Sequence, residues 1–326
     1  MTVEIIHGDC IEQMRNMPDN SVDSIVTDPP YGLGFMGKKW DSIPPGEEWA
    51  VECLRVLKPG GHLLAFGGSR TWHRLAVAVE DAGFEIRDSI AWLYGSGFPK
   101  HRAALKPAFE PVVMGRKPFK GSLTANEAIH GTGALNIDAT RIGTTKDVPA
   151  SASTSGRNGI YSHMDALTER GGMDPNQGRW PANVVLDETT AEMLDQQSGT
   201  TKSSNHVRHN TAEAHNKTTS MHSSAADWTT RGAQDEGGTS RFFYVAKAPK
   251  RERPVVDGIA HPTVKPLALM RWLVKLVTPP GGIVLEPFAG SGATVEACML
   301  EGFNVIAIEQ EADYLPLIQA RIDRAA

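Results

Sequence analysis

The sequence has few cysteines and none of the patterns that would tie them together. Cys10, Cys53 and Cys298 are the three cysteines among its 326 residues. They are scattered and lack CxxC spacing, which argues against a disulfide framework and a zinc site and favours a reducing compartment. Four histidines fall in a long polar segment without regular ligand spacing, so a solvated loop explains them better than a metal site. They are His206, His209, His215 and His222. We therefore expect no metal ion.

Long apolar runs and a dominant charge sign are missing as well. No stretch reaches the roughly 18 apolar residues of a membrane span, and Met1 to Glu4 is not a basic segment followed by an apolar run. We therefore expect a cytoplasmic protein that binds no membrane. The formal net charge of −5 excludes a uniformly basic surface, so a polyanion would need a local basic patch. The clearest candidate patch consists of Lys247, Lys250, Arg251, Arg253, Lys265, Arg271 and Lys275.

The first motif is Asp28-Pro29-Pro30-Tyr31, which follows the β-branched run 24–27. The run predicts a buried strand that ends where proline removes the backbone donors. Ligands bind at the carboxyl ends of strands in an open α/β sheet, so Asp28 is expected in a crevice. Its carboxylate and the Pro29 carbonyl can accept hydrogen bonds from a planar amine, while Tyr31 stacks on the ring that carries the amine. A plain strand-ending turn is the alternative, because Asp-Pro is common in turns.

The second motif lies near the C-terminus, where the strand-like run 282–286 leads into the glycine turn 287–292 and then a helix. A further strand at 304–308 ends at Glu309. This is a nucleotide-binding layout, in which glycines let the backbone approach the ligand and an acid about twenty residues on binds the ribose hydroxyls. The turn lacks the GK[ST] of a P-loop and does not match GxGxxG. A nucleoside without phosphates therefore fits better.

Elsewhere, strands and helices alternate, which predicts a mostly parallel α/β sheet. Further strands are expected at 3–6, 62–66, 86–94 and 108–114, and helices at 11–17, 47–57, 70–82 and 293–300. From about residue 131 to 240, Ser, Thr, Asn, Gly and His dominate and apolar periodicity fails. Such a segment is a functional insertion or is partly disordered.

Two more motifs complete a recognisable order. Gly8-Asp9 follows the first expected strand, and His261-Pro262-Thr263-Val264-Lys265-Pro266 precedes the glycine turn. In this order the chain resembles the β class of amino DNA methyltransferases, which use S-adenosylmethionine, over roughly residues 1–115 and 241–326. The resemblance implies a Rossmann-like sheet of seven strands, six parallel and one antiparallel. The sheet is circularly permuted, so that the strand before the glycine turn, at 282–286, lies near the C-terminus.

The resemblance also divides the chain and assigns its residues. It implies a catalytic half at 1–115, an inserted target recognition region at 116–240 and a cofactor-binding half at 241–326. Asp28, Pro29, Pro30 and Tyr31 would hold the target base. The expected cofactor-binding residues are Asp9 at the adenine end, Glu309 on the ribose, Thr263, Lys265 and Pro266 at the methionine end, and Asp28, Glu286, Phe288, Gly290, Ser291 and Gly292. Glu286 departs from the family, in which many relatives carry aspartate.

The implied reaction transfers a methyl group from S-adenosylmethionine to N6 of adenine in duplex DNA, with the base flipped out of the helix. The N6 lone pair is delocalised into the ring. Acceptors at Asp28 and the Pro29 carbonyl would favour a tetrahedral amine and stabilise the positive charge that develops on nitrogen. Transfer to N4 of cytosine is the main alternative. An RNA or protein-amide methyltransferase is disfavoured by the motif order and the insertion, and a non-catalytic nucleic-acid-binding module by the intact motifs.

The expected partner is double-stranded DNA, in a bacterial or phage cytoplasm. No PD-(D/E)xK nuclease motif is evident, so we expect an orphan enzyme or the partner of a separate restriction nuclease. Many relatives of this class form dimers, so a homodimer is also expected.

Overall fold

The computed structural model describes residues 1–34, 37, 41, 44–99, 102–143, 178–202, 208–209, 229–230, 236–246 and 253–326. His206, His215, His222, Lys247, Lys250 and Arg251 lie outside the described residues. The chain forms two compact units. Unit 1 comprises Met1–Thr140, Ala182–Ala191 and Tyr244–Ala326, and unit 2 comprises Arg141–Pro181 and Glu192–Phe243. Unit 1 thus includes 116–140 and 182–191 of the expected target recognition region, whose recognition role stays a prediction.

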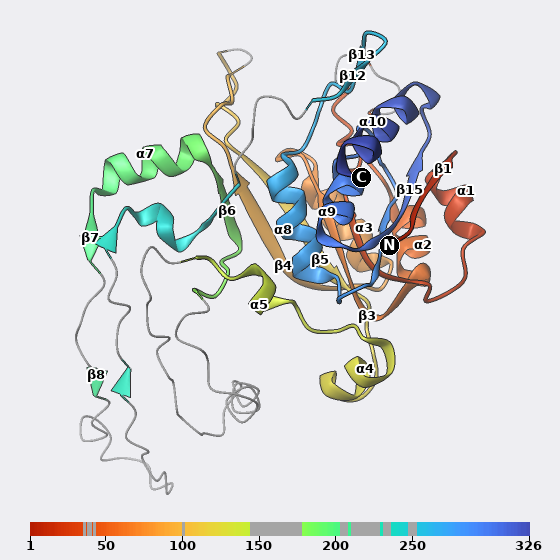
Figure 1. The fold of residues 1–326 in the computed structure, drawn as a ribbon, viewed down its shortest axis with the longest axis horizontal. Coiled ribbons are helices and arrows are strands. Elements are labelled where there is room, and N and C mark those ends of the chain that lie inside the picture. The colour runs from red at the N-terminus through yellow and green to blue at the C-terminus, as the bar shows by residue number, and fades with distance from the viewer. Residues whose placement is uncertain are drawn as a thin grey trace, which may run out of the picture. The chain divides into compact units, whose positions relative to one another are not determined.

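In the described part of unit 1, nine strands form one sheet in the order β1-β15-β14-β2-β3-β5-β4-β6-β11 (Figure 1). They are β1 Val3–His7, β2 Val22–Thr27, β3 Leu57–Phe66, β4 Glu85–Leu93, β5 Phe109–Arg116, β6 Val184–Asp187, β11 Tyr244–Ala246, β14 Ile283–Glu286 and β15 Asn304–Glu309. Neighbours pair in parallel, except that β5 is antiparallel to both β3 and β4. The strands from β1 to β4 in this order confirm the expected Rossmann-like set of six parallel strands and one antiparallel strand. β6 and β11 extend the sheet beyond the expected seven strands.

The permuted order follows from how the chain ends meet in the sheet. β14 lies between β15 and β2, so a strand near the C-terminus is flanked by one from the N-terminal half. β1 pairs with β15 from Val3 opposite Val305 to His7 opposite Glu309. Every residue of β2 is buried, as expected for a parallel strand covered on both faces.

Helices cover the two faces of the sheet, and strand side chains alternate between them. One core cluster joins Val26 and Leu64 to α8, α9 and α10, and the other joins Ile25 and Leu63 to α1, α2 and α3. These helices are α1 Cys10–Arg15, α2 Glu47–Val56, α3 Trp72–Asp81, α8 Leu267–Val277, α9 Ala293–Glu301 and α10 Leu315–Ala325. α8 and α10 were not among the predicted helices. Among the described residues, no helix combines the length and apolar character that a bilayer span requires.

Shorter elements complete the described parts of the fold. They are α4 Leu123–His130, α5 Ile137–Thr140, α7 Glu188–Ser198, η3 Thr239–Phe242, η4 Ala312–Tyr314, β7 Thr201–Lys202, β8 Arg208–His209, β9 Thr229–Thr230, β10 Glu236–Gly237, β12 Val255–Val256 and β13 Ile259–Ala260. The six strands among them pair as three two-stranded sheets, β10 with β7, β12 with β13 and β8 with β9.

The strand predicted at 62–66 begins earlier, at Leu57, directly after α2. The pairing of β3 with β2 shifts register between Val22 and Ser24, which accommodates Pro59. The Pro59 carbonyl then accepts hydrogen bonds from the Asn126 amide at 2.9 Å and the Thr132 hydroxyl at 2.6 Å. Residues 58–61, which lie between the predicted helix and the predicted strand, therefore belong to an irregular start of β3.

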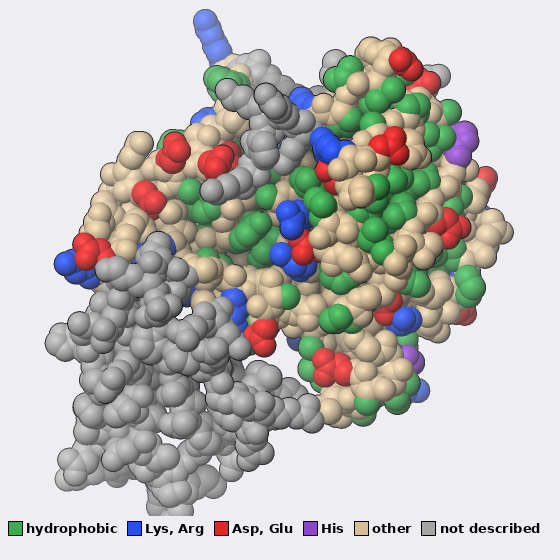
Figure 2. All heavy atoms as spheres, viewed as in Figure 1, with side chains coloured by type: hydrophobic (Ala, Val, Ile, Leu, Met, Phe, Trp, Pro, Cys, Tyr) green, Lys and Arg blue, Asp and Glu red, His purple; other side chains and the backbone are tan. Residues whose placement is uncertain are grey.

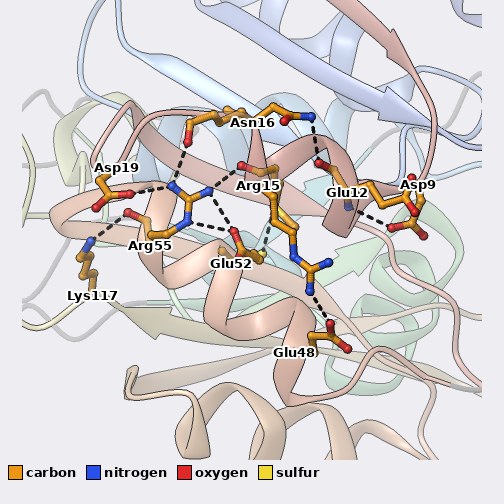
Figure 3. Close-up of polar contacts among 12 residues, drawn as sticks. Asp9, Glu12, Arg15, Asn16, Asp19, Glu48, Glu52, Arg55 and Lys117 are labelled. Atoms are coloured by element: carbon orange, nitrogen blue, oxygen red, sulfur yellow. Dashed lines mark hydrogen bonds and ion pairs between the residues drawn. The ribbon is translucent and has the colours of Figure 1, made fainter.

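Helix α1 is anchored on α2 by Arg55, as Figure 3 shows. The Arg55 guanidinium donates to the Met14 carbonyl at 2.5 Å, which satisfies a carbonyl left open at the C-terminal end of α1. Ion pairs with Asp19 at 2.6 Å and Glu52 at 2.9 Å hold the guanidinium. At the other end of α1, the Asp9 carboxylate accepts from two backbone N–H groups, as an N-cap does. The anchoring of α1 therefore also fixes the position of Asp9.

In unit 2, Asp195 and Arg241 organise the described segment 236–243. The Asp195 carboxylate accepts from the Ser240 N–H and the Ser240 hydroxyl, both at 2.7 Å. Arg241 donates to the Gly237 and Gly238 carbonyls, also at 2.7 Å. Its guanidinium lies 4.3 Å from the centre of the Phe242 ring. These contacts give the segment a defined conformation.

Candidate active site

The carboxyl ends of β1, β2, β3, β14 and β15 meet at one edge of the sheet, and a cavity of about 1200 Å³ lies there. All predicted site residues line it except Pro266 and Gly292. The predicted residues in the lining are Asp9, Asp28, Pro29, Pro30, Tyr31, Thr263, Lys265, Glu286, Phe288, Gly290, Ser291 and Glu309. Two motifs that lie more than two hundred residues apart in the sequence thus share one cavity.

Lys265 is the centre of a charged cluster that lines this cavity. Its ammonium donates to Asp28 Oδ2 at 2.7 Å and to the Tyr31 hydroxyl at 3.0 Å, and it forms an ion pair with Glu110 Oε2 at 3.1 Å. The Lys265 side chain is only 8% exposed, against 23% for Asp28 and 21% for Glu110. The Phe66 ring lies beneath the ammonium, with its centre 4.8 Å from Nζ. The three ammonium protons thus have three acceptors.

The pKa values of this cluster follow from burial and charge. Burial alone would lower the pKa of Lys265, but the neighbouring Asp28 and Glu110 carboxylates outweigh burial and raise it. For Tyr31, burial and the same two carboxylates all raise the pKa, to well above its ordinary value. Lys265 is therefore an ammonium and Tyr31 a neutral hydroxyl at physiological pH.

Tyr31 is held from both its backbone and its hydroxyl. Its N–H donates to Asp41 Oδ1 at 2.6 Å, and its carbonyl accepts from the Thr71 hydroxyl at 2.7 Å. The hydroxyl lies 2.9 Å from both Asp28 Oδ1 and Glu110 Oε2. The motif was expected to offer an aromatic face for stacking, and this stays a prediction. The hydrogen bonds of the hydroxyl were not anticipated.

Glu110 is the residue of this cluster that sequence reasoning missed. It lies at the start of β5, the antiparallel strand, next to Trp92 of β4 in the sheet register. Because β5 runs opposite to its neighbours, its first residues lie at the edge where the other strands end. Glu110 has no motif around it, and the acid before Pro111 reads as a plain strand residue. The only signal would have been the direction of β5.

Glu286 lies at the end of β14, the strand that pairs with β2, and is 1% exposed. Its carboxylate accepts from the Thr27 and Thr294 hydroxyls and from the Phe288 N–H at 3.0 Å. Burial raises the pKa of Glu286 to about 8, against the opposing effect of these hydrogen bonds. Glu286 therefore links β2, β14 and α9, and its oxygens are already engaged within the protein.

Glu309 organises the glycine turn. Its carboxylate accepts from the Gly290 N–H at 2.6 Å and from the Glu311 N–H at 2.8 Å. Gly290 has a φ of +52°, and a Cβ there would lie 3.2 Å from Nε2 of His261. A larger residue at 290 would therefore be strained and would press on the His261 ring. Burial raises the pKa of Glu309.

The two predicted residues outside the lining have structural roles. Pro266 precedes α8, and its carbonyl accepts the Met270 N–H at 3.1 Å. Gly292 begins α9 with a φ of +79°, and a Cβ there would lie 3.1 Å from the Cα of Ile318 in α10. Gly292 thus permits the close packing of α9 and α10.

The candidate basic patch is wrong at Lys265, and an acid lies beside two more of its described members. Lys265 is buried in the cavity rather than exposed, while Arg271 and Lys275 form ion pairs with Glu301 at 2.5 and 3.5 Å. Arg253 lines the cavity. On the face shown in Figure 2, the described Lys and Arg side chains are interspersed with Asp and Glu side chains. The error arose because α8 was not recognised as a helix packed on the sheet.

Comparisons with known proteins agree with this fold and site. A family model described as DNA methylase matches residues 22–320. The chain is 24% identical to the type II methyltransferase M.HpaI of Haemophilus parainfluenzae, covering 99% of this chain and 75% of that protein. It is 23% identical to the DNA adenine methyltransferase YhdJ of Escherichia coli K12, covering 99% of this chain and 83% of that protein.

Two solved structures share the fold. The PvuII DNA methyltransferase, described as cytosine-N4-specific, matches with a TM-score of 0.52 and 15% identity over 98% of this chain and 86% of that chain. The crystal structure of M1.HpyAVI matches with a TM-score of 0.50 and 18% identity over 99% of both chains. At these identities the likeness is one of fold.

Proposed function

Because the chain belongs to the DNA methylase family that its residues 22–320 match, we propose that it transfers a methyl group from S-adenosylmethionine to N6 of adenine in duplex DNA. The observation that carries this proposal is that Asp28 and Glu309 line one cavity. The cavity therefore joins an acceptor for an amine to an acceptor for ribose hydroxyls.

The residues around the glycine turn fit the cofactor. The backbone at Gly290 approaches the cavity without a side chain, and Phe288 offers an apolar surface supported by Trp49, with ring centres 5.9 Å apart. Each Glu309 oxygen accepts one backbone N–H and keeps a further lone pair for a ribose hydroxyl. S-adenosylmethionine would supply an electrophilic methyl group carried on a sulfonium. Phe288, Gly290, Ser291, Glu309 and Asp9 would hold it.

The residues around Asp28 would act on the target amine. The Asp28 carboxylate and the Pro29 carbonyl accept its protons and draw the nitrogen toward tetrahedral geometry, which frees its lone pair. As positive charge develops on nitrogen, the carboxylate stabilises that charge more strongly than it stabilises the neutral amine. Lys265 fixes the orientation of the carboxylate by donating to Oδ2.

The rim of the cavity has features that suit duplex DNA. The segment 103–109 lines the cavity, and Leu105 within it is 92% exposed. Arg70, Lys106 and Arg253 also contribute to the lining. Cations would bind phosphates, and an exposed apolar side chain can enter the base stack when a nucleotide leaves it. A base flipped out of duplex DNA would therefore enter the cavity through this rim.

Methylation of N4 of cytosine remains the second candidate, because the PvuII enzyme with the same fold is named as cytosine-N4-specific. The leading aspartate of the motif and the adenine-specific relative YhdJ favour adenine. The deciding test is incubation of the protein with duplex DNA and isotope-labelled S-adenosylmethionine, followed by mass analysis of the nucleosides. Label in N6-methyladenine supports the proposal, label in N4-methylcytosine replaces it with the second candidate, and no label in DNA rejects both.

The expected homodimer and restriction-nuclease partner stay predictions. Light scattering at working concentration tests the first, since a monomeric mass would contradict it.

A further inference from the structure

A single proton at the centre of the charged cluster has two acceptors. The Tyr31 hydroxyl lies 2.9 Å from Asp28 Oδ1 and 2.9 Å from Glu110 Oε2. A phenolic hydroxyl carries one proton, so it donates fully to only one of the two carboxylates at a time. Rotation about the bond between the ring and the oxygen is sufficient to exchange them. The ring need not move, since the Tyr31 backbone is held by Asp41 and Thr71.

The choice between these acceptors matters because the other Asp28 oxygen is already engaged. Asp28 Oδ2 accepts from the Lys265 ammonium at 2.7 Å. The oxygen Oδ1 is then the stronger acceptor for an incoming amine, provided that the Tyr31 proton points elsewhere. A hydroxyl that donates to Oδ1 occupies a lone pair and lowers the acceptor strength of the carboxylate. Glu110 offers the alternative acceptor at an equal distance, through the oxygen Oε2 that also lies 3.1 Å from the Lys265 ammonium.

We propose that Glu110 is a positioning residue that draws the Tyr31 proton away from Asp28, leaving Asp28 Oδ1 to accept from the target amine. This role rests on the proposed function. The protonation state of Tyr31 agrees with it, because burial and both carboxylates raise its pKa and keep the hydroxyl a donor. Lys265 supports the arrangement from the other side by donating to the Tyr31 oxygen at 3.0 Å, which leaves the Tyr31 proton to face the carboxylates.

The decisive variant is Glu110→Gln, which keeps the shape of the side chain and removes its charge. The neutral amide oxygen competes poorly with the charged Asp28, so the Tyr31 proton turns to Oδ1. We expect the single-turnover rate of methyl transfer to fall about tenfold, the effect of weakening one charge-assisted hydrogen bond in the transition state. Binding of S-adenosylmethionine and of DNA containing 2-aminopurine should remain near that of the wild type.

The double variant Glu110→Gln, Tyr31→Phe separates this role from a structural one. Removing the hydroxyl removes the competing donor, so the double variant should turn over at the rate of Tyr31→Phe alone. A residue that only stabilises the cluster would give losses that add in the double variant. Glu85→Gln is the matched control, since Glu85 lies on β4, forms an ion pair with Arg116 at 2.5 Å and does not line the cavity. It should leave all rates unchanged.

The outcomes distinguish this inference from the proposed function. If the wild type transfers no label to DNA, the proposed function fails. If the wild type is active but Glu110→Gln transfers methyl groups at the same rate, only the role of Glu110 is overturned. The same conclusion follows if the wild type is active but the double variant is slower than Tyr31→Phe alone. Rescue by Tyr31→Phe, with unchanged binding of DNA and cofactor, supports the exchange of the Tyr31 proton.

Discussion

Two pairs of acids line the cavity, and the groups that offset their charge differ. Asp28 and Glu110 share the Lys265 ammonium and keep about a fifth of their side-chain surface exposed. Glu286 and Glu309 are buried, and the partners described above are hydroxyls and backbone N–H groups. Neutral donors offset burial only in part, so the pKa values of Glu286 and Glu309 are raised.

This difference indicates which acids would take part in the reaction and which mainly hold the structure together. Around Asp28, hydrogen bonds can rearrange when a substrate amine enters, since the Tyr31 proton has two acceptors. Glu286 instead holds three donors from separate segments in one geometry. Glu309 is intermediate, because it shapes the turn and also lines the cavity. Variants of Asp28, of Glu309 and of Glu286 should therefore affect different measurements, namely turnover, cofactor binding and stability.

The largest effect is expected for Asp28→Asn. An amide oxygen lacks the charge that stabilises a positive nitrogen, and the amide NH₂ can turn a donor toward the substrate. We expect turnover to fall by roughly 100-fold or more, as for other preorganised transition-state contacts. Binding of DNA and cofactor, measured by 2-aminopurine fluorescence and calorimetry, should change little. A variant that turns over at the wild-type rate would remove Asp28 from the catalytic role.

Much of this site was predictable because its key residues follow strands that the sequence marks clearly. Asp28 and Glu309 each end a β-branched run, and the parallel sheet brings such ends to one edge. Glu110 was not predictable in this way, since its position depends on the reversed direction of β5. Helix α8 was not predicted because Arg271 and Lys275 were interpreted as part of a basic surface, although most residues of this helix are apolar and buried. The position of Glu110 depends on information that exists only in the assembled sheet, whereas the apolar residues of α8 stand in the sequence itself.

The second largest effect is expected for Glu309→Ala beside the glycine turn. The variant loses the contact with the cofactor ribose and the acceptor for the Gly290 N–H. Loss of one charge-assisted hydrogen bond should weaken binding of S-adenosylmethionine by roughly 1.5 to 3 kcal/mol, as calorimetry would measure. The control is Glu4→Ala, an exposed acid on the neighbouring strand β1 that does not line the cavity. Equal affinities of the two variants would contradict the ribose assignment.

A smaller effect distinguishes Glu286 from the acids that carry charge. Its pKa is raised from 4.5 to about 8, so the folded state binds a proton more tightly than the unfolded state. The free energy of unfolding should therefore fall as the pH rises from about 4.5 to about 8, with a loss of about 2 kcal/mol between pH 6 and pH 8. Glu286→Gln has no proton to lose there. Urea denaturation at several pH values should show a flatter dependence for this variant, and identical slopes would contradict the raised pKa.

The smallest effect is expected for Leu105→Ala, which tests whether the rim of the cavity receives the target base from duplex DNA. Leu105 is 92% exposed on the rim of the cavity, so Leu105→Ala should leave the unfolding free energy unchanged. If Leu105 enters the stack that the flipped base leaves, its loss should weaken base capture by about 1 kcal/mol or less. The loss should shrink for a mispaired target, because a mismatch is easier to unstack.

Ile129 provides the matched control for Leu105. It is a similarly apolar side chain, 76% exposed on α4, and does not line the cavity. Fluorescence of 2-aminopurine at the target position, in matched and mismatched duplexes, measures base capture for Leu105→Ala, Ile129→Ala and the wild type. If base capture is weaker only in Leu105→Ala, and the mismatch reduces this loss, then the rim of the cavity contacts DNA. Equal fluorescence in both variants would mean that Leu105 is an ordinary exposed side chain, and the surface that opens the duplex would then have to lie elsewhere on the chain.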